Sequence, residues 1–143
     1  MESKQERPGC VWLIALYFFI TAVSGFASLY AISSGFFTKL PGARAEQLAY
    51  FSTLSALDYG VSILIILFNI AGVIYLLRLK KEAVALFIAA FLLGMGLTAW
   101  QIATKNYLAV MGRPGMVGFA VGTVLILVVI GYVANLRRKG ILK

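Results

Sequence analysis

The sequence predicts an all-α integral membrane protein, folded as a compact bundle of four transmembrane helices with both termini in the cytoplasm. The first observation is composition: 62% of the 143 residues are hydrophobic and 13% are charged, with a mean hydropathy of +0.94. Soluble domains are about 45–50% apolar and about 25% charged, so this chain lacks the polar residues that a water-facing surface requires. The other two observations are the spacing of the charged residues and their uneven distribution between helix ends.

Charge-free stretches divide the chain into four candidate spans within a single domain, 1–143. Their residues are 8–38, 59–77, 83–104 and 114–136. Each stretch reaches the roughly 18–20 residues that cross a ~30 Å hydrocarbon core as a helix. Backbone groups in lipid must form internal hydrogen bonds, and a transmembrane barrel would instead need short alternating segments. We therefore predict transmembrane helices at 10–32, 57–78, 83–105 and 116–136.

The first predicted helix has a cleaved signal peptide as its alternative interpretation. The apolar core of a signal peptide is about 7–15 residues long. Here the apolar run extends from Val11 to Ile32, and Glu2 and Glu6 dilute the positive charge that precedes it. A retained helix is therefore the favoured interpretation.

The outer loop, 33–56, joins the first two predicted helices. Pro41-Gly42 predicts a break, and residues 43–51 are rich in helix formers with apolar side chains at helical spacing. This pattern predicts a short helix in the outer loop, at the membrane interface. The favoured interpretation is a helical extension packed on its own bundle, and the alternative is a lid over a ligand site.

The remaining connections are shorter. Arg78–Glu82 is so short that the second and third helices must form an antiparallel hairpin. The third and fourth helices are joined by residues 106–115, which include Gly112, Arg113, Pro114 and Gly115 as a cluster of helix breakers. Proline is tolerated in the first turn of a helix, so Pro114 fits the start of the fourth.

Lysine and arginine near the helix ends predict the orientation, because they accumulate on the cytoplasmic side. Nine lie on the side of the termini: Lys4, Arg7, Arg78, Lys80, Lys81, Arg137, Arg138, Lys139 and Lys143. Four lie on the other side: Lys39, Arg44, Lys105 and Arg113. These cations lie beside anionic lipid headgroups and match no nucleic-acid-binding motif. The expected partner is thus the lipid bilayer, in a bacterial inner membrane, and we expect no nucleic acid.

The residues available for chemistry are few. Histidine is absent, Cys10 is the one cysteine, and the five acidic residues are scattered along the chain. No spacing typical of a metal site, a phosphate-binding loop or a nucleophile elbow occurs. We therefore expect no catalytic residues, no cofactor and no bound metal.

Small and polar residues recur on one face of each predicted helix, where membrane helices pack against each other. The predicted helix-packing positions are Ser24, Gly25, Ser28, Gly72, Gly94, Gly118 and Gly122. The last two form a Gly-x-x-x-Gly pair. The alternative interpretation of this pair is that it forms the contact between two protomers of a dimer. Patterns of this kind also arise by chance in a chain with 14 glycines.

Asp58 is the central candidate site residue, because ionisable groups inside a membrane span mark functional sites. Six residues are candidates for ligand or ion binding, or for joining helices: Asp58, Ser62, Asn69, Thr98, Gln101 and Lys105. Their predicted depths favour an Asp58–Lys105 pair between the second and third helices. Asp58 has two alternatives, hydration near the headgroups and the binding of a cation or proton. Asn69 lies about 16 Å deeper, where an amide is expected to bond across helices.

These observations favour a non-enzymatic small inner-membrane protein. It would act through helix–helix contacts as an accessory or assembly subunit, or as a toxin-immunity-type binder, of another membrane protein or of itself. The alternative is a small homo-oligomeric transporter or channel with Asp58 and Lys105 beside the pathway. A lipid-modifying membrane enzyme is the third class, and the missing catalytic residues disfavour it.

Overall fold

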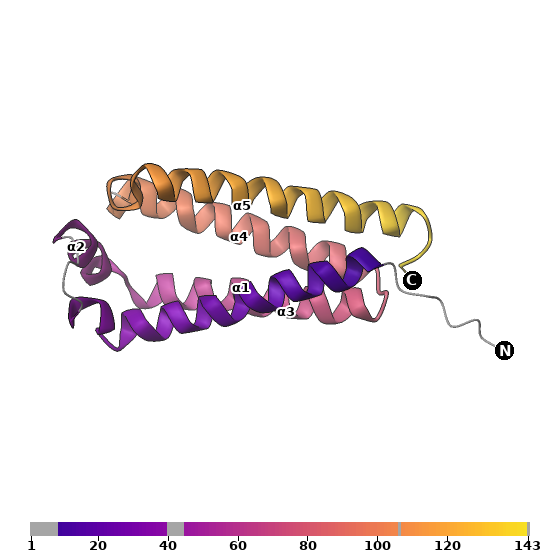
Figure 1. Ribbon diagram of the computed structural model, residues 1–143, viewed down its shortest axis with the longest axis horizontal. Helices are drawn as coiled ribbons and strands as arrows, with labels where there is room; N and C mark the ends of the chain where they lie inside the picture. Colours follow the sequence, from indigo (N-terminus) through magenta and orange to yellow (C-terminus); the bar gives the residue numbers. More distant parts are fainter. Residues whose placement is uncertain (1–8, 40–44, 106, 143) are drawn as a thin grey trace.

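A computed structural model describes residues 9–39, 45–105 and 107–142. The elements in these ranges are helical: α1 (Gly9–Ser33), the 3-10 turn η1 (Phe36–Lys39), α2 (Ala45–Thr53), α3 (Ala56–Leu77), α4 (Glu82–Lys105) and α5 (Tyr107–Arg138) (Figure 1). Among them α1, α3, α4 and α5 are each long and apolar enough to cross a membrane. This confirms an all-helical chain with four candidate spans and a short helix in the loop between the first two.

Several predicted features lie outside the described residues. They are the break at Pro41-Gly42 and the cations Lys4, Arg7, Arg44 and Lys143. The helices α1, α3 and α4 each begin and end within one residue of the predicted spans.

The helix α5 begins at Tyr107, but it consists of two helical segments that meet at a kink at Gly112. The φ of 61° and ψ of −178° at Gly112 are not helical; they are open to glycine but strained for other residues. The segment after the kink therefore begins close to the predicted start at residue 116. Pro114 lies two residues after Gly112, in the first turn of the segment that follows the kink, where its missing N–H leaves no hydrogen bond unmade. The predicted cluster of breakers therefore does interrupt the helix, and the helical segment 107–111 before it was not predicted.

The long helices pack in the order α1, α3, α4, α5, with α3 and α4 forming the antiparallel hairpin. In Figure 1 the start of α1 and the end of α5 lie at one end of the bundle and α2 at the other. We call the first the termini end; it holds the start of α1, the turn between α3 and α4, and the end of α5. We call the second the loop end; it holds η1, α2 and the junction of α4 with α5.

The hydrophobic core lies at the termini end. It comprises Val11, Ile14, Phe18, Leu76, Ala83, Val84, Phe87, Val133, Leu136 and Leu142. Phe87 is 1% exposed and stacks on Phe18 with ring centroids 4.8 Å apart. Gly72 lets α3 approach this ring closely, because a Cβ at Gly72 would lie 2.9 Å from Phe87. Side chains of all four long helices therefore meet in one apolar core.

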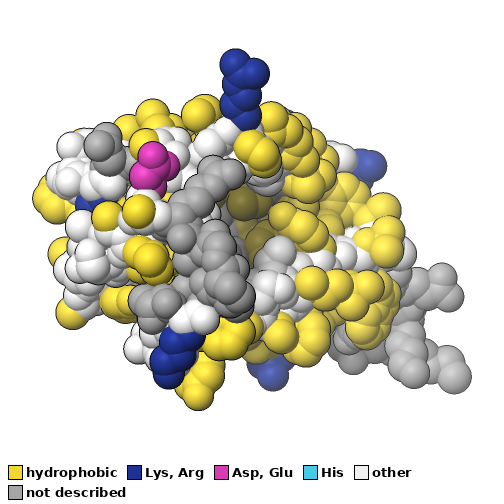
Figure 2. All heavy atoms as spheres, turned by 60° about the vertical axis from the view of Figure 1, so that its left-hand side comes forward, with side chains coloured by type: hydrophobic (Ala, Val, Ile, Leu, Met, Phe, Trp, Pro, Cys, Tyr) yellow, Lys and Arg dark blue, Asp and Glu magenta, His cyan; other side chains and the backbone are white. Residues whose placement is uncertain are grey.

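Large hydrophobic side chains also cover the outside of the bundle, where charged groups are sparse (Figure 2). In α5 only 6% of the most apolar 18-residue window is buried, against 22% in α1 and in α4. Such a surface is unfavourable in water and suited to a hydrocarbon surrounding. The apolar exterior therefore agrees with the candidate spans.

Candidate functional site

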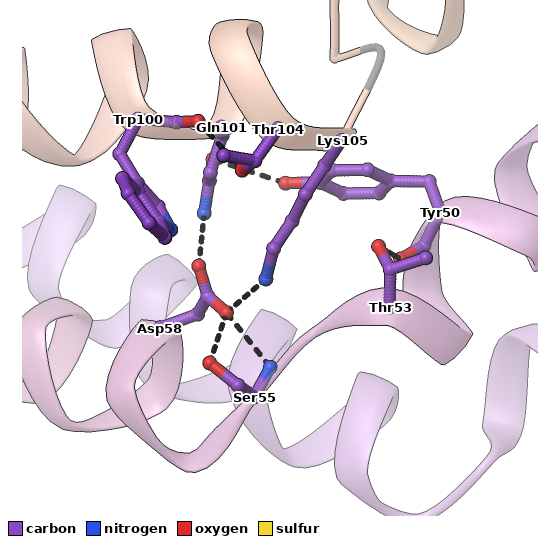
Figure 3. A network of polar contacts seen from close by, with 8 residues as sticks. All are labelled: Tyr50, Thr53, Ser55, Asp58, Trp100, Gln101, Thr104 and Lys105. Carbon is purple, nitrogen blue, oxygen red and sulfur yellow. Dashed lines mark hydrogen bonds and ion pairs between the residues drawn. The ribbon is translucent and has the colours of Figure 1, made fainter.

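A polar cluster at the loop end joins three helices through Tyr50, Ser55, Asp58, Gln101 and Lys105, which we call the loop-end cluster (Figure 3). Its centre is Asp58, which lies in the first turn of α3 and is 2% exposed. The Ser55 backbone N–H and the Ser55 hydroxyl each donate to Asp58 Oδ2 at 2.7 Å. An acid at the third helical position commonly reaches back to the capping residue in this way, and its charge favours the helix N-terminus. Local sequence thus fixes the carboxylate.

The helix α4 supplies the other two partners of the carboxylate from successive turns. Gln101 Nε2 donates to Asp58 Oδ1 at 3.2 Å, and the Lys105 ammonium forms an ion pair with Asp58 Oδ2. The exposed fractions of the Lys105 and Asp58 side chains are 9% and 3%. Removing charge from water is costly unless the charge is paired and hydrogen-bonded, and Asp58 is both.

Tyr50 extends the loop-end cluster into α2. Its hydroxyl donates to Gln101 Oε1 at 3.0 Å, and its ring packs on that of Tyr107 with centroids 5.4 Å apart. Burial raises the pKa of the Tyr50 phenol, and the nearby Tyr107 and Asp58 raise it further. The phenol therefore stays protonated and able to donate at neutral pH. Through Tyr50, α2 is attached to the bundle as a packed extension.

The hydrogen bonding of the loop-end cluster is complete. Among the described residues, every buried side-chain nitrogen or oxygen has a partner. In the same part of the chain, no three acids or cysteines come together as a metal site. Asp58 accepts four hydrogen bonds, so binding a cation or a proton would first require displacing Lys105 or another donor. The geometry is that of a contact between helices.

Two of the pockets near the loop-end cluster lie between helices and are open to the surface, and we call them the first and the second chamber. The first has a volume of about 480 Å³ and is lined from α1, α2, α3, α4 and α5, with Asp58 and Gln101 in its wall. The second, of about 230 Å³, lies between α3, α4 and α5. Ile65, Gly94 and Thr98 line both, so the chambers are adjacent.

The remaining predicted polar residues line these chambers. Ser62 lies in the wall of the first chamber, Asn69 in that of the second, and Thr98 in both. Within the described ranges, none of the three side chains forms a hydrogen bond. The expected bond from Asn69 to another helix is therefore not seen there, because the second chamber separates its amide from α5.

The predicted helix-packing positions fall into two groups. Gly72 and Gly25 lie at close contacts between helices. A Cβ atom added at Gly25 would lie 3.0 Å from Ile66 Cδ1. Gly94 and Gly122 line the second chamber. The remaining positions, Ser24, Ser28 and Gly118, are exposed, so contacts within this chain do not use them.

Sequence reasoning missed Tyr50 and Ser55. The spacing Ser55-x-x-Asp58 before an apolar run is a helix-start signal and could have identified Ser55. Tyr50 lies in the stretch 43–51 that was predicted to be helical, and it was not among the candidate site residues. No local signal connects it to Gln101, which lies 51 residues away.

Compared with known proteins, the chain matches no protein-family model, no curated protein and no solved structure.

Proposed function

We propose that this chain is a non-enzymatic small inner-membrane protein that acts through helix–helix contacts. Its partner would be another integral membrane protein, for which it serves as an accessory or assembly subunit or as a toxin-immunity-type binder. Four apolar helices support the membrane placement. The excess of lysine and arginine at the termini end supports cytoplasmic termini in a bacterial inner membrane.

A surface groove between α3 and α4 carries the proposal of a protein partner. Its volume is about 600 Å³, and its lining is apolar: Leu57, Val61, Ala89, Leu92, Leu93, Gly96, Leu97 and Trp100. A Cβ at Gly96 would meet nothing within 4 Å. Small residues at such positions let a neighbouring helix backbone approach closely, which is how helices associate in lipid. A lipid chain needs no such approach, so a transmembrane helix is the occupant we propose.

The loop-end cluster supports the same proposal. Asp58 is the one acidic residue that is buried among the described residues, and its oxygens are occupied by Ser55, Gln101 and Lys105. The transporter or channel alternative, with Asp58 and Lys105 beside the pathway, stays a prediction. It requires this ion pair to separate during transport.

Site-specific photo-cross-linking in native membranes tests the proposal. A photoreactive amino acid at Leu92 lies in the groove, and one at Val128 on α5 is its matched control, since both side chains are 62% exposed. We expect Leu92, but not Val128, to give a discrete adduct with a second integral membrane protein. Gly96→Leu fills the groove and should abolish the adduct. Gly131→Leu, also at an open position, should keep it.

Three results would contradict the proposal. Adducts from Leu92 to lipid alone would remove the evidence for a partner helix, and adducts insensitive to Gly96→Leu would place the contact elsewhere. An adduct between two copies of the chain would replace the heterologous partner with a homo-oligomer. The last result would fit the transport alternative. The next test would then be solute flux into liposomes, compared between the parent protein and Asp58→Asn.

A further inference from the structure

The two chambers at the loop end contain polar groups that no part of the described chain satisfies. Ser62, Thr98 and Asn69 follow one another along the chambers from the loop end toward the middle of the bundle. Asn69 lies 11 residues beyond Asp58 in the same helix, which corresponds to about 16 Å. An amide or hydroxyl without a partner is strongly unfavourable in an apolar medium. These groups therefore call for a partner from outside the chain.

The lining also restricts the charge of that partner. Among the described residues Asp58 is the one charged residue in the wall of either chamber, and Lys105 neutralises it. A second ion brought into the chambers would find no counter-charge to offset its loss of hydration. An uncharged polar group, by contrast, can bond with the hydroxyls and the amide.

The rest of the lining is hydrocarbon and aromatic. The second chamber is lined by Ile65, Phe91, Met95, Phe119 and Ile126, around the polar groups of Asn69, Thr98 and Thr123. Mostly apolar walls with a few polar groups are typical of small-molecule sites, which have volumes of about 300–1,000 Å³. The first chamber is within that range, and the second extends it toward the middle of the bundle.

We propose that the two chambers form one binding site for an uncharged amphiphile. This ligand has a single hydrocarbon chain, which occupies the apolar lining, and hydroxyl or carbonyl oxygens, which bond with Ser62, Thr98 and Asn69. The site requires the membrane placement but not the partner protein. The proposed protein groove shares Leu97 with the first chamber but otherwise has its own lining, which includes Leu92, Gly96 and Trp100.

Photolabelling of the purified full chain in detergent micelles tests this site. The probe is hexadecanol carrying a diazirine, and labelled residues are identified by mass spectrometry. We expect labelling to concentrate on lining residues such as Met95 and Phe119, and unlabelled hexadecanol to compete for it. Palmitate and hexadecyltrimethylammonium, which have the same chain length but a charge, should compete poorly.

Two variants of α5 separate the chamber from the outer surface. Gly122 lines the second chamber with nothing within 4 Å of an added Cβ, so Gly122→Leu should fill the chamber and remove the labelling. Gly131 is open and exposed on the same helix, so Gly131→Leu should label as the parent protein does. Asn69→Leu removes one hydrogen-bonding group, and we expect the apparent affinity for hexadecanol to fall by roughly tenfold.

Several outcomes would overturn the site. Equal labelling of lining residues and of outward Val124 would mean that alkyl chains merely coat the protein. Labelling that persists in Gly122→Leu would place the probe outside the chambers. If palmitate or hexadecyltrimethylammonium competed with the probe and hexadecanol did not, the proposal that the headgroup is uncharged would be contradicted. None of these results affects the adduct expected at Leu92, so the two proposals fail separately.

Discussion

The two ends of this bundle are held together by different interactions. At the termini end, apolar side chains such as Phe87 and Val133 pack into a core. At the loop end, Asp58 joins α3 to α4 through Gln101 and Lys105. Gln101 in turn accepts a hydrogen bond from Tyr50 of α2. Close packing leaves little room, whereas a few directional bonds hold the helices together at single points and leave space between them. The difference fits the position of the two chambers beside the polar cluster.

The helix α5 shows the same contrast along its own length. Its buried residues, Val133 and Leu136, both lie near the termini end. Toward the loop end, Gly118 is exposed and Gly122 borders the second chamber. Regions with few buried apolar contacts open more easily than cores do. We therefore expect the loop end to be the part of the bundle that admits and releases ligands.

The largest effect is expected from Phe87→Ala, which removes the central ring of the termini-end core. Replacing a buried phenylalanine by alanine destabilises proteins by about 3–5 kcal/mol. We expect a loss of this size in the free energy of unfolding, measured by SDS titration in mixed micelles. Amide hydrogen exchange should increase first at the termini end, in the residues around Gly72 and Phe18.

Phe19→Ala is the matched control, because Phe19 is 66% exposed on the outside of α1. Its effect on unfolding in micelles should be close to zero. If both phenylalanine variants were equally destabilised, the termini-end core would not be the main source of apolar stability.

A smaller and local effect is expected from Tyr50→Phe. The variant keeps the ring but leaves Gln101 Oε1 without its donor, and a typical hydrogen bond contributes about 0.5–1.5 kcal/mol. We expect hydrogen exchange to accelerate in α2, while exchange around Phe87 stays as in the parent. Faster exchange throughout the bundle would show that the two ends are not independent.

The sequence was sufficient to predict the helices, because their cause is local. Charge-free runs must be helical in a bilayer, and Asp58 and Lys105 mark the ends of two such runs at one depth. The predicted start of the fourth helix lies close to the kink at Gly112, whereas the helical segment 107–111 before the kink was not predicted. Charge spacing indicates where the apolar surface ends, and a short helical segment beyond that point leaves it unchanged.

The site was less predictable than the helices. Stripes of small residues show that a helix has a packing face, but not which neighbour it meets; Gly25 contacts Ile66, whereas Ser24 and Ser28 are exposed. Asp58 and Gln101 could be proposed from their depth. Tyr50 could not, because its position depends on how a loop of more than one element folds back onto α4.

The central claim is that Asp58 works as a helix contact through Lys105, and a double-mutant cycle tests it most directly. The variants are Asp58→Asn, Lys105→Gln and their combination, with the free energy of unfolding in mixed micelles as the readout. Contacting residues couple by about 0.5–3 kcal/mol, and a buried ion left alone is strongly destabilising. We predict that each single variant is destabilised and that the double variant is more stable than the sum of the two losses implies. Strictly additive losses, with a coupling of zero, would contradict the account.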